Sequence, residues 1–78
     1  MITKEQALNN LGRAYFADVI EWKILVNSPH DLEQRTRYHR ANEKYTTLRA
    51  VYLDCDLIEF DDIEGAWWYD IKLERPIS

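Results

Sequence analysis

The sequence predicts an all-α, mainly helical fold: a long antiparallel helical hairpin with a short C-terminal element folded against it. Two long segments, residues 4–26 and residues 28–59, carry apolar side chains at alternating three- and four-residue spacing. This spacing places the side chains on one face of an α-helix. The connection between the segments is short, and short helix–helix connections usually join antiparallel neighbours. We therefore expect residues 1–78 to form a single helical-hairpin domain.

The first predicted helix begins after Thr3, because Thr3 and Gln6 have the spacing of a capping box. We expect it to run from about Lys4 to Val26. One apolar stripe on this helix consists of Leu8, Leu11, Tyr15, Val19, Trp22 and Val26. A second stripe, on another side, consists of Phe16, Ile20 and Ile24. The first stripe can pack against the second helix, whereas the second stripe requires another cover: a third helix, a second copy of the chain or a foreign partner.

The stretch from Ser28 to Asp31 predicts the start of the second helix. The Ser28 hydroxyl can accept from the free amides of the first turn, and Pro29 suits the first helical position. Asp31 then adds negative charge at the positive end of the helix dipole. The helix is expected to continue to about Glu59. Its apolar seam consists of Tyr38, Ala41, Tyr45, Leu48, Tyr52 and Cys55.

Residues 61–74 fit two different structures. The stretch from Asp61 to Glu64 resembles a second capping box, which would start a short C-terminal helix. The residues on one face of that helix would be Ile63, Trp67 and Ile71. Strand-like alternation also runs through the segment, in Trp67, Tyr69, Ile71 and Leu73. In that case residues 53–60 would supply the other arm of a β-hairpin that turns at residues 61–65. The sequence favours the helix, and Arg75-Pro76 is expected to end either element.

A chain of 78 residues buries only a small core and usually needs extra stabilisation. Its one cysteine excludes an intramolecular disulfide. Because the apolar stripes exceed what one hairpin can bury, we expect a homodimer of four-helix character. No apolar run approaches the roughly 20 residues of a membrane span, and the N-terminus has no signal-peptide core. The expected location is therefore the cytoplasm.

No residue pattern indicates an enzyme, a cofactor site or a metal site. A catalytic thiol needs nearby positive charge, whereas Cys55 lies between two aspartates. His30 and His39 are not at a metal-ligand spacing. The acids of residues 54–64 do not follow the calcium-loop pattern, and the two glycines cannot form a Gly-rich phosphate loop. We therefore predict a non-enzymatic protein without a cofactor.

The net charge of −4 is unevenly distributed. Residues 51–78 carry two Lys/Arg and eight Asp/Glu, a net −6, whereas residues 34–50 carry five and one, a net +4. The acidic C-terminal third also holds adjacent tryptophans. Exposed aromatic residues flanked by acids suit a protein-binding hot spot, and aromatic residues equally complete small cores. The predicted partner-binding residues are Trp67, Trp68, Tyr69, Asp61, Asp62 and Glu64.

The alternative function is nucleic-acid binding by the basic stretch of the second helix. Its candidate residues fall within roughly 60° of one another beside the seam: Arg37, Arg40 and Lys44. The other basic residues fall on the opposite side of the seam: Arg35, His39 and Arg49. The cations thus straddle the core stripe, and the overall acidity repels phosphates. Nucleic acid is therefore the less favoured partner.

The sequence thus favours a small acidic protein–protein interaction module. Small acidic proteins without a catalytic constellation are often inhibitors, including phage or plasmid products that block host or defence complexes. We expect an inhibitor or regulator of this type, which would occlude or bridge a protein partner.

Overall fold

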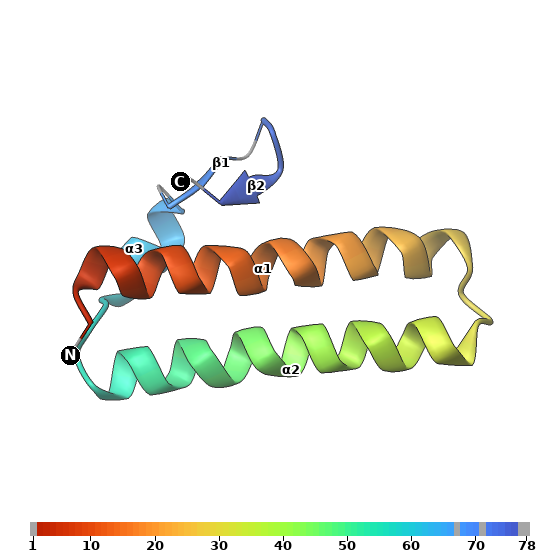
Figure 1. Cartoon of the computed structure of the whole chain (residues 1–78), viewed down its shortest axis with the longest axis horizontal. Helices are drawn as coiled ribbons and strands as arrows, with labels where there is room; N and C mark the ends of the chain where they lie inside the picture. Colours follow the sequence, from red (N-terminus) through yellow and green to blue (C-terminus); the bar gives the residue numbers. More distant parts are fainter. Residues whose placement is uncertain (1, 67, 71, 77–78) are drawn as a thin grey trace.

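The fold is an antiparallel hairpin of two long helices with a small C-terminal unit packed on the first of them (Figure 1). The structure is a computed structural model that describes residues 2–66, 68–70 and 72–76. The helices are α1 (Lys4–Asn27), α2 (Leu32–Asp54) and α3 (Phe60–Gly65), followed by strands β1 (Tyr69–Asp70) and β2 (Arg75–Pro76). We refer to α3, β1 and β2 together as the C-terminal unit. The prediction of an all-α hairpin is confirmed.

Helix α1 begins at the predicted capping box. The Gln6 N–H donates to the Thr3 hydroxyl at 3.1 Å, and the Thr3 N–H donates to the Gln6 side-chain carbonyl at 2.9 Å. Two otherwise unpaired backbone donors are satisfied in this way. Because this signal is local, the sequence predicted the start of the helix correctly.

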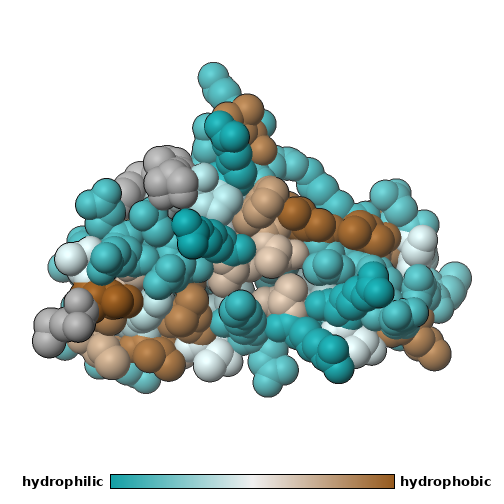
Figure 2. Space-filling view, in the orientation of Figure 1, coloured by the Kyte–Doolittle hydropathy of each residue, from teal (hydrophilic) through white to brown (hydrophobic). Residues whose placement is uncertain are grey.

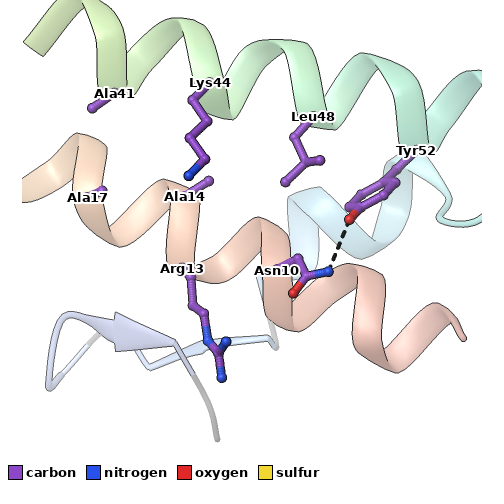
Figure 3. A pocket seen from close by; sticks show the side chains of 8 residues that line it. All are labelled: Asn10, Arg13, Ala14, Ala17, Ala41, Lys44, Leu48 and Tyr52. Atoms are coloured by element: carbon purple, nitrogen blue, oxygen red, sulfur yellow. Dashed lines mark hydrogen bonds between the residues drawn. The ribbon is translucent and has the colours of Figure 1, made fainter. Parts of the chain in front are cut away.

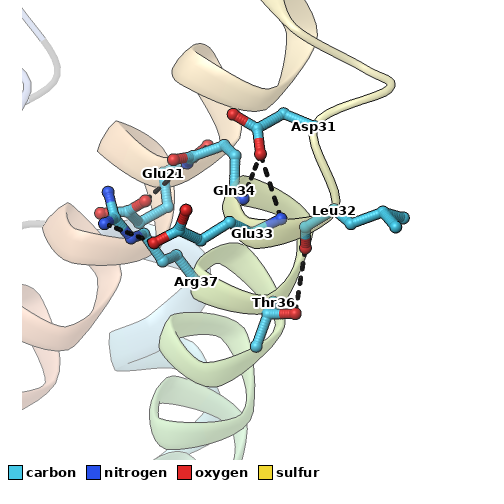
Figure 4. Close-up of polar contacts among 7 residues, drawn as sticks. All are labelled: Glu21, Asp31, Leu32, Glu33, Gln34, Thr36 and Arg37. Atoms are coloured by element: carbon cyan, nitrogen blue, oxygen red, sulfur yellow. Dashed lines mark hydrogen bonds and ion pairs between the residues drawn. The ribbon is translucent and has the colours of Figure 1, made fainter.

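The start of α2 differs from the prediction. Asp31, and not Ser28, is the N-cap: its carboxylate accepts from the N–H groups of Glu33 and Gln34 at 3.0 and 3.1 Å (Figure 4). Ser28 instead closes α1, because its N–H donates to the carbonyls at the end of that helix. Pro29 therefore lies in the turn between the helices. A carboxylate at the positive helix end is favoured by charge as well as by hydrogen bonding.

Helix α2 also ends earlier than predicted, at Asp54 instead of near Glu59. Asp56 adopts a left-handed conformation with φ of 58°, which aspartate tolerates better than most residues. The chain reverses there, and the Leu57 N–H returns to the Tyr52 carbonyl at 3.0 Å. Cys55 is consequently an exposed C-cap residue, so its predicted place in the apolar seam is wrong.

The C-terminal unit combines parts of both predicted alternatives. A helix does form, but its N-cap is Glu59, whose N–H donates to the Asp62 carboxylate at 2.8 Å. Beyond a left-handed Ala66, β1 pairs antiparallel with β2, with Tyr69 opposite Pro76. The predicted pairing with residues 53–60 is therefore wrong, and Arg75–Pro76 forms a strand instead of only ending one. Trp67 and Ile71 lie outside the described residues.

Helix α1 lies between α2 and the C-terminal unit and contributes to both contacts (Figure 1). The Tyr15 ring lies 5.3 Å from the Tyr45 ring of α2 and 4.8 Å from the Tyr69 ring of β1. Leu8 and Leu11 are completely buried in the same core. Farther along the hairpin, Trp22 of α1 and Tyr38 of α2 are in ring contact at 5.2 Å, a partly exposed pair.

We predict that Trp68→Ala strongly lowers the free energy of unfolding of the chain. Trp68 is 2% exposed, and its indole N–H donates to the Asp62 carbonyl at 2.9 Å. Removing such a side chain costs about 3–5 kcal/mol of the free energy of unfolding. The measurement is chemical unfolding followed by circular dichroism.

The matched control is Trp22→Ala, because Trp22 is 50% exposed. Its loss should cost about 1 kcal/mol. Equal losses for the two tryptophan variants would contradict the burial that distinguishes them.

Candidate functional site

The aromatic residues predicted to bind a partner lie in the core. Trp68 and Tyr69 are 2% and 7% exposed, and both pack against Tyr15. In the folded chain both side chains are therefore core residues, and their role in partner binding stays a prediction that burial does not support. They are buried because the C-terminal unit uses them to cover α1. Trp67, the third aromatic residue of the prediction, lies outside the described residues.

The predicted acidic residues divide into structural and exposed groups. Asp62 holds the start of α3 and forms an ion pair with Lys4 at 3.0 Å. The hydrogen bond from Lys4 to Asp62 raises the pKa of that ammonium group. Asp61 and Glu64 are exposed. Of these three acids, Asp62 thus stabilises the C-terminal unit, whereas Asp61 and Glu64 place negative charge on its surface.

Arg37, Arg40 and Lys44 lie on one side of α2, because their helical spacing places them within roughly 60° of one another, but they differ in their partners. Arg37 forms an exposed ion pair with Glu33 at 3.3 Å (Figure 4). Arg40 and Lys44 line a surface depression instead. Because Arg37 already has a carboxylate partner, Arg40 and Lys44 are the members of the predicted basic set that remain available.

A groove runs between α1 and α2 on the side of the hairpin that carries Arg40 and Lys44. One part of it has a volume of about 340 Å³ and is shown in Figure 3. The residues that line it are Asn10, Arg13, Ala14, Ala17, Ala41, Lys44, Leu48 and Tyr52. A second depression of about 440 Å³ shares Lys44 and Leu48 with the first and extends over α2 to Arg40 and Val51. We call the two together the α1–α2 groove.

Small residues make the groove. The positions where α1 and α2 face each other are filled by alanines 14, 17 and 41, whose side chains leave space between the helices (Figure 3). At one end of the groove, the Asn10 side-chain amide donates to the Tyr52 hydroxyl at 3.2 Å and holds the helices together. Further cross-helix hydrogen bonds fix the hairpin: Asn42 donates to Asp18, and Gln34 donates to both the backbone carbonyl and the carboxylate of Glu21. The floor of the groove, formed by the alanines and Leu48, is therefore apolar. The hydrogen bonds between the helices fix the spacing of α1 and α2 along it.

Cations border this floor on both helices. The Lys44 side chain extends from α2 toward α1 at Ala14, whereas the Arg13 side chain points from α1 away from α2 (Figure 3). Arg40 adds a positive charge on α2, next to Glu43. The groove linings thus hold three cations and one acid. This arrangement favours a ligand that is apolar in the middle and acidic at its edges.

The apolar surface continues along α1 beyond the groove. Ile20 and Ile24 are 38% and 46% exposed and follow Ala17 at helical spacing, so the three residues lie on one side of α1. Figure 2 shows this apolar strip running along α1 toward the hairpin turn, between hydrophilic surroundings. Of the second stripe that the sequence predicted, Phe16 is packed against the core, and the two isoleucines remain uncovered in the single chain.

A separate cavity of about 300 Å³ lies where the C-terminal unit meets α1, lined by Tyr15, Val19, Ala66, Tyr69 and Glu74. The Tyr69 hydroxyl is buried and has no hydrogen-bond partner within the described part of the chain. Burial raises the pKa of Tyr69, and it also raises the pKa of Tyr45 in the core. Glu74, which lines the cavity, is paired with Lys23 of α1.

The described residues bring together no group of three or more His, Cys, Asp or Glu side chains that could hold a metal ion. Within the same ranges, no helix has both the length and the apolar character needed to cross a membrane. Comparison with protein-family models, with curated proteins and with solved structures gives no match to this chain. The groove is therefore interpreted from its own geometry.

We predict opposite outcomes for two buried tyrosines when each loses its hydroxyl. Tyr52→Phe removes the acceptor of the Asn10 side chain at the groove, so it should lower the free energy of unfolding by about 0.5–1.5 kcal/mol. Tyr69→Phe removes a hydroxyl with no partner among the described residues, so it should leave stability unchanged or raise it. Urea unfolding of the two variants measures this difference. A larger loss for Tyr69→Phe than for Tyr52→Phe would contradict the buried, unpaired hydroxyl.

Proposed function

We propose that the protein is a non-enzymatic protein–protein interaction module that binds its partner through the α1–α2 groove and the adjoining strip of Ile20 and Ile24. The observation that supports this proposal is an uncovered apolar surface bordered by cations on both helices. Exposed apolar patches with polar rims are typical of protein-binding surfaces. The proposed surface replaces the aromatic residues of the C-terminal third as the centre of binding.

The energetic gain from covering this surface is substantial for a small protein. Full burial of an isoleucine side chain contributes about 1.5–3 kcal/mol relative to full exposure, and Ile20 and Ile24 retain 38% and 46% of their exposure. Alanines 17 and 41 allow a partner's backbone to approach closely. Apolar burial in the middle, with charged contacts at the rim, matches the anatomy of known protein interfaces.

Binding at this surface would act by occluding or bridging the partner, because nothing in the groove suggests chemistry. An inhibitor or regulator of the phage or mobile-element type remains our prediction for the biological role. The exposed acids Asp61 and Glu64 lie on the C-terminal unit. They are available for a second, weaker contact.

Nucleic-acid binding is the second candidate function, and one observation favours it. Arg13, from α1, joins Arg40 and Lys44 along the groove, so three cations lie near one another. Against it, the chain carries a net charge of −4, which repels phosphates. The groove floor is aliphatic and its tyrosine is buried, so it offers no ring for base stacking.

The proposed function predicts position-specific crosslinking. A photoreactive amino acid at Ala17, in the groove, should give a protein adduct in the cells that express this chain. The same substitution at Thr46, which is exposed outside the groove, should not. Mass spectrometry of the adducts identifies the partner segment. An adduct pattern that is the same at both positions, or an adduct with nucleic acid alone at Ala17, would remove the proposal.

A further inference from the structure

We infer that the partner segment is an acidic amphipathic α-helix, seated along α1 so that it becomes a third helix beside α1 and α2. This inference rests on the proposed function and specifies the chemistry of the partner. Three observations support it: the shape of the groove, the absence of ion-pair partners for the cations that line it, and the position of these cations on both helices.

The shape fits a helix. The apolar surface runs lengthwise along α1 from Ala14 through Ala17 to Ile20 and Ile24, at the spacing of one helix face. Leu48 and Val51 continue it on α2. An elongated apolar surface between two helices is the usual receptor for an amphipathic helix, which contributes anchors at i, i+3 or i+4, and i+7.

The ion pairs within the chain indicate the charge that the partner should carry. Most basic residues of α1 and α2 have a partner in the chain. Ion pairs join Lys4 to Asp62, Lys23 to Glu74 and Arg37 to Glu33. Arg35 donates to the Pro29 carbonyl, and Arg49 lies over the Phe60 ring at 5.7 Å.

Among the described residues, five cations of the two helices have no carboxylate within ion-pair distance. Arg35 and Arg49 have the carbonyl and ring contacts given above, which leaves three cations with neither: Arg13, Arg40 and Lys44. All three line the α1–α2 groove. The unpaired positive charge of the hairpin is thus gathered where its apolar surface is uncovered. Because the cations border the strip from both helices, the partner helix should carry acids on both flanks of its apolar stripe.

A second copy of the chain fits this surface less well. A two-fold dimer places the same patch of both copies face to face. Here Arg13, Arg40 and Lys44 would meet the same positively charged patch, and like charges across an interface are costly. The observations therefore favour a different chain with acidic flanks over the homodimer that the sequence predicts.

The test uses two designed helical peptides of about 21 residues, or three heptads. Both carry leucine at the apolar positions of each heptad. One has glutamate at the flanking positions, and its matched control has lysine there. Fluorescence anisotropy with the full chain, at peptide concentrations where each is monomeric, should show at least about tenfold tighter binding of the glutamate peptide.

Charge reversal in the groove supplies the decisive comparison. The double variant Arg40→Glu with Lys44→Glu should lose the preference for the glutamate peptide or invert it. The control is Lys72→Glu with Arg75→Glu, which makes the same charge change at exposed positions outside the groove. This control should keep the preference. Circular dichroism checks that both variants remain folded.

Several results would overturn the inference. Equal affinity for the two peptides, no binding of either, or the same effect from both double variants would each exclude an acidic helix as the occupant. Tighter binding of a labelled oligonucleotide than of the glutamate peptide would favour nucleic acid. A two-chain mass in light scattering that increases with Arg40→Glu and Lys44→Glu would favour a second copy. These results leave the crosslinking at Ala17 to decide the proposed function separately.

Discussion

The close approach of Trp68 to Gly12 determines which sides of the hairpin are covered and which are open. An ideal Cβ at Gly12 would lie 3.0 Å from the Trp68 ring and 3.1 Å from the Pro76 Cβ. Contacts this short are tighter than nine in ten real Cβ contacts, so a side chain at this position would require Trp68 or Pro76 to shift. Glycine allows the C-terminal unit to lie this close to α1. With α2 on a second side, the remaining side of α1 carries Ala17, Ile20 and Ile24. The open strip is therefore a consequence of where one tryptophan fits.

The sequence predicted the features that depend on local physics. The Thr3 capping box and the apolar periodicity gave α1 its correct start and end within about one residue. The antiparallel hairpin followed from the short connection. The errors occurred where two local signals competed: Ser28 and Asp31 are both good N-caps, and the structure uses the charged one for α2. At Asp56, a single left-handed residue ends α2, which periodicity alone does not reveal.

The site was predictable only in part, because it depends on contacts between segments that are distant in sequence. Helical geometry correctly placed Arg37, Arg40 and Lys44 on one side of α2. The Glu33–Arg37 pair has the i,i+4 spacing of helix neighbours and is also a local feature. Helical geometry could not show that Arg13 joins Arg40 and Lys44 from α1. Adjacent tryptophans in an acidic segment predict a binding surface, whereas Trp68 is buried and completes the core. A stronger signal was present in alanines 14, 17 and 41, whose small size creates the groove once the helices pair.

The left-handed residues of the chain have a consequence for the order of folding. The described residues with positive φ are Asp56, Ala66 and Glu74, and all of them follow α2. Each costs about 1–2 kcal/mol, and the contacts of this segment with α1 span most of the chain. The hairpin, whose turn closes a short loop, should form early, whereas the C-terminal segment docks last and detaches first. Amide exchange in α3 and the strands would then be faster than in the hairpin, which makes this segment the least protected part of the fold.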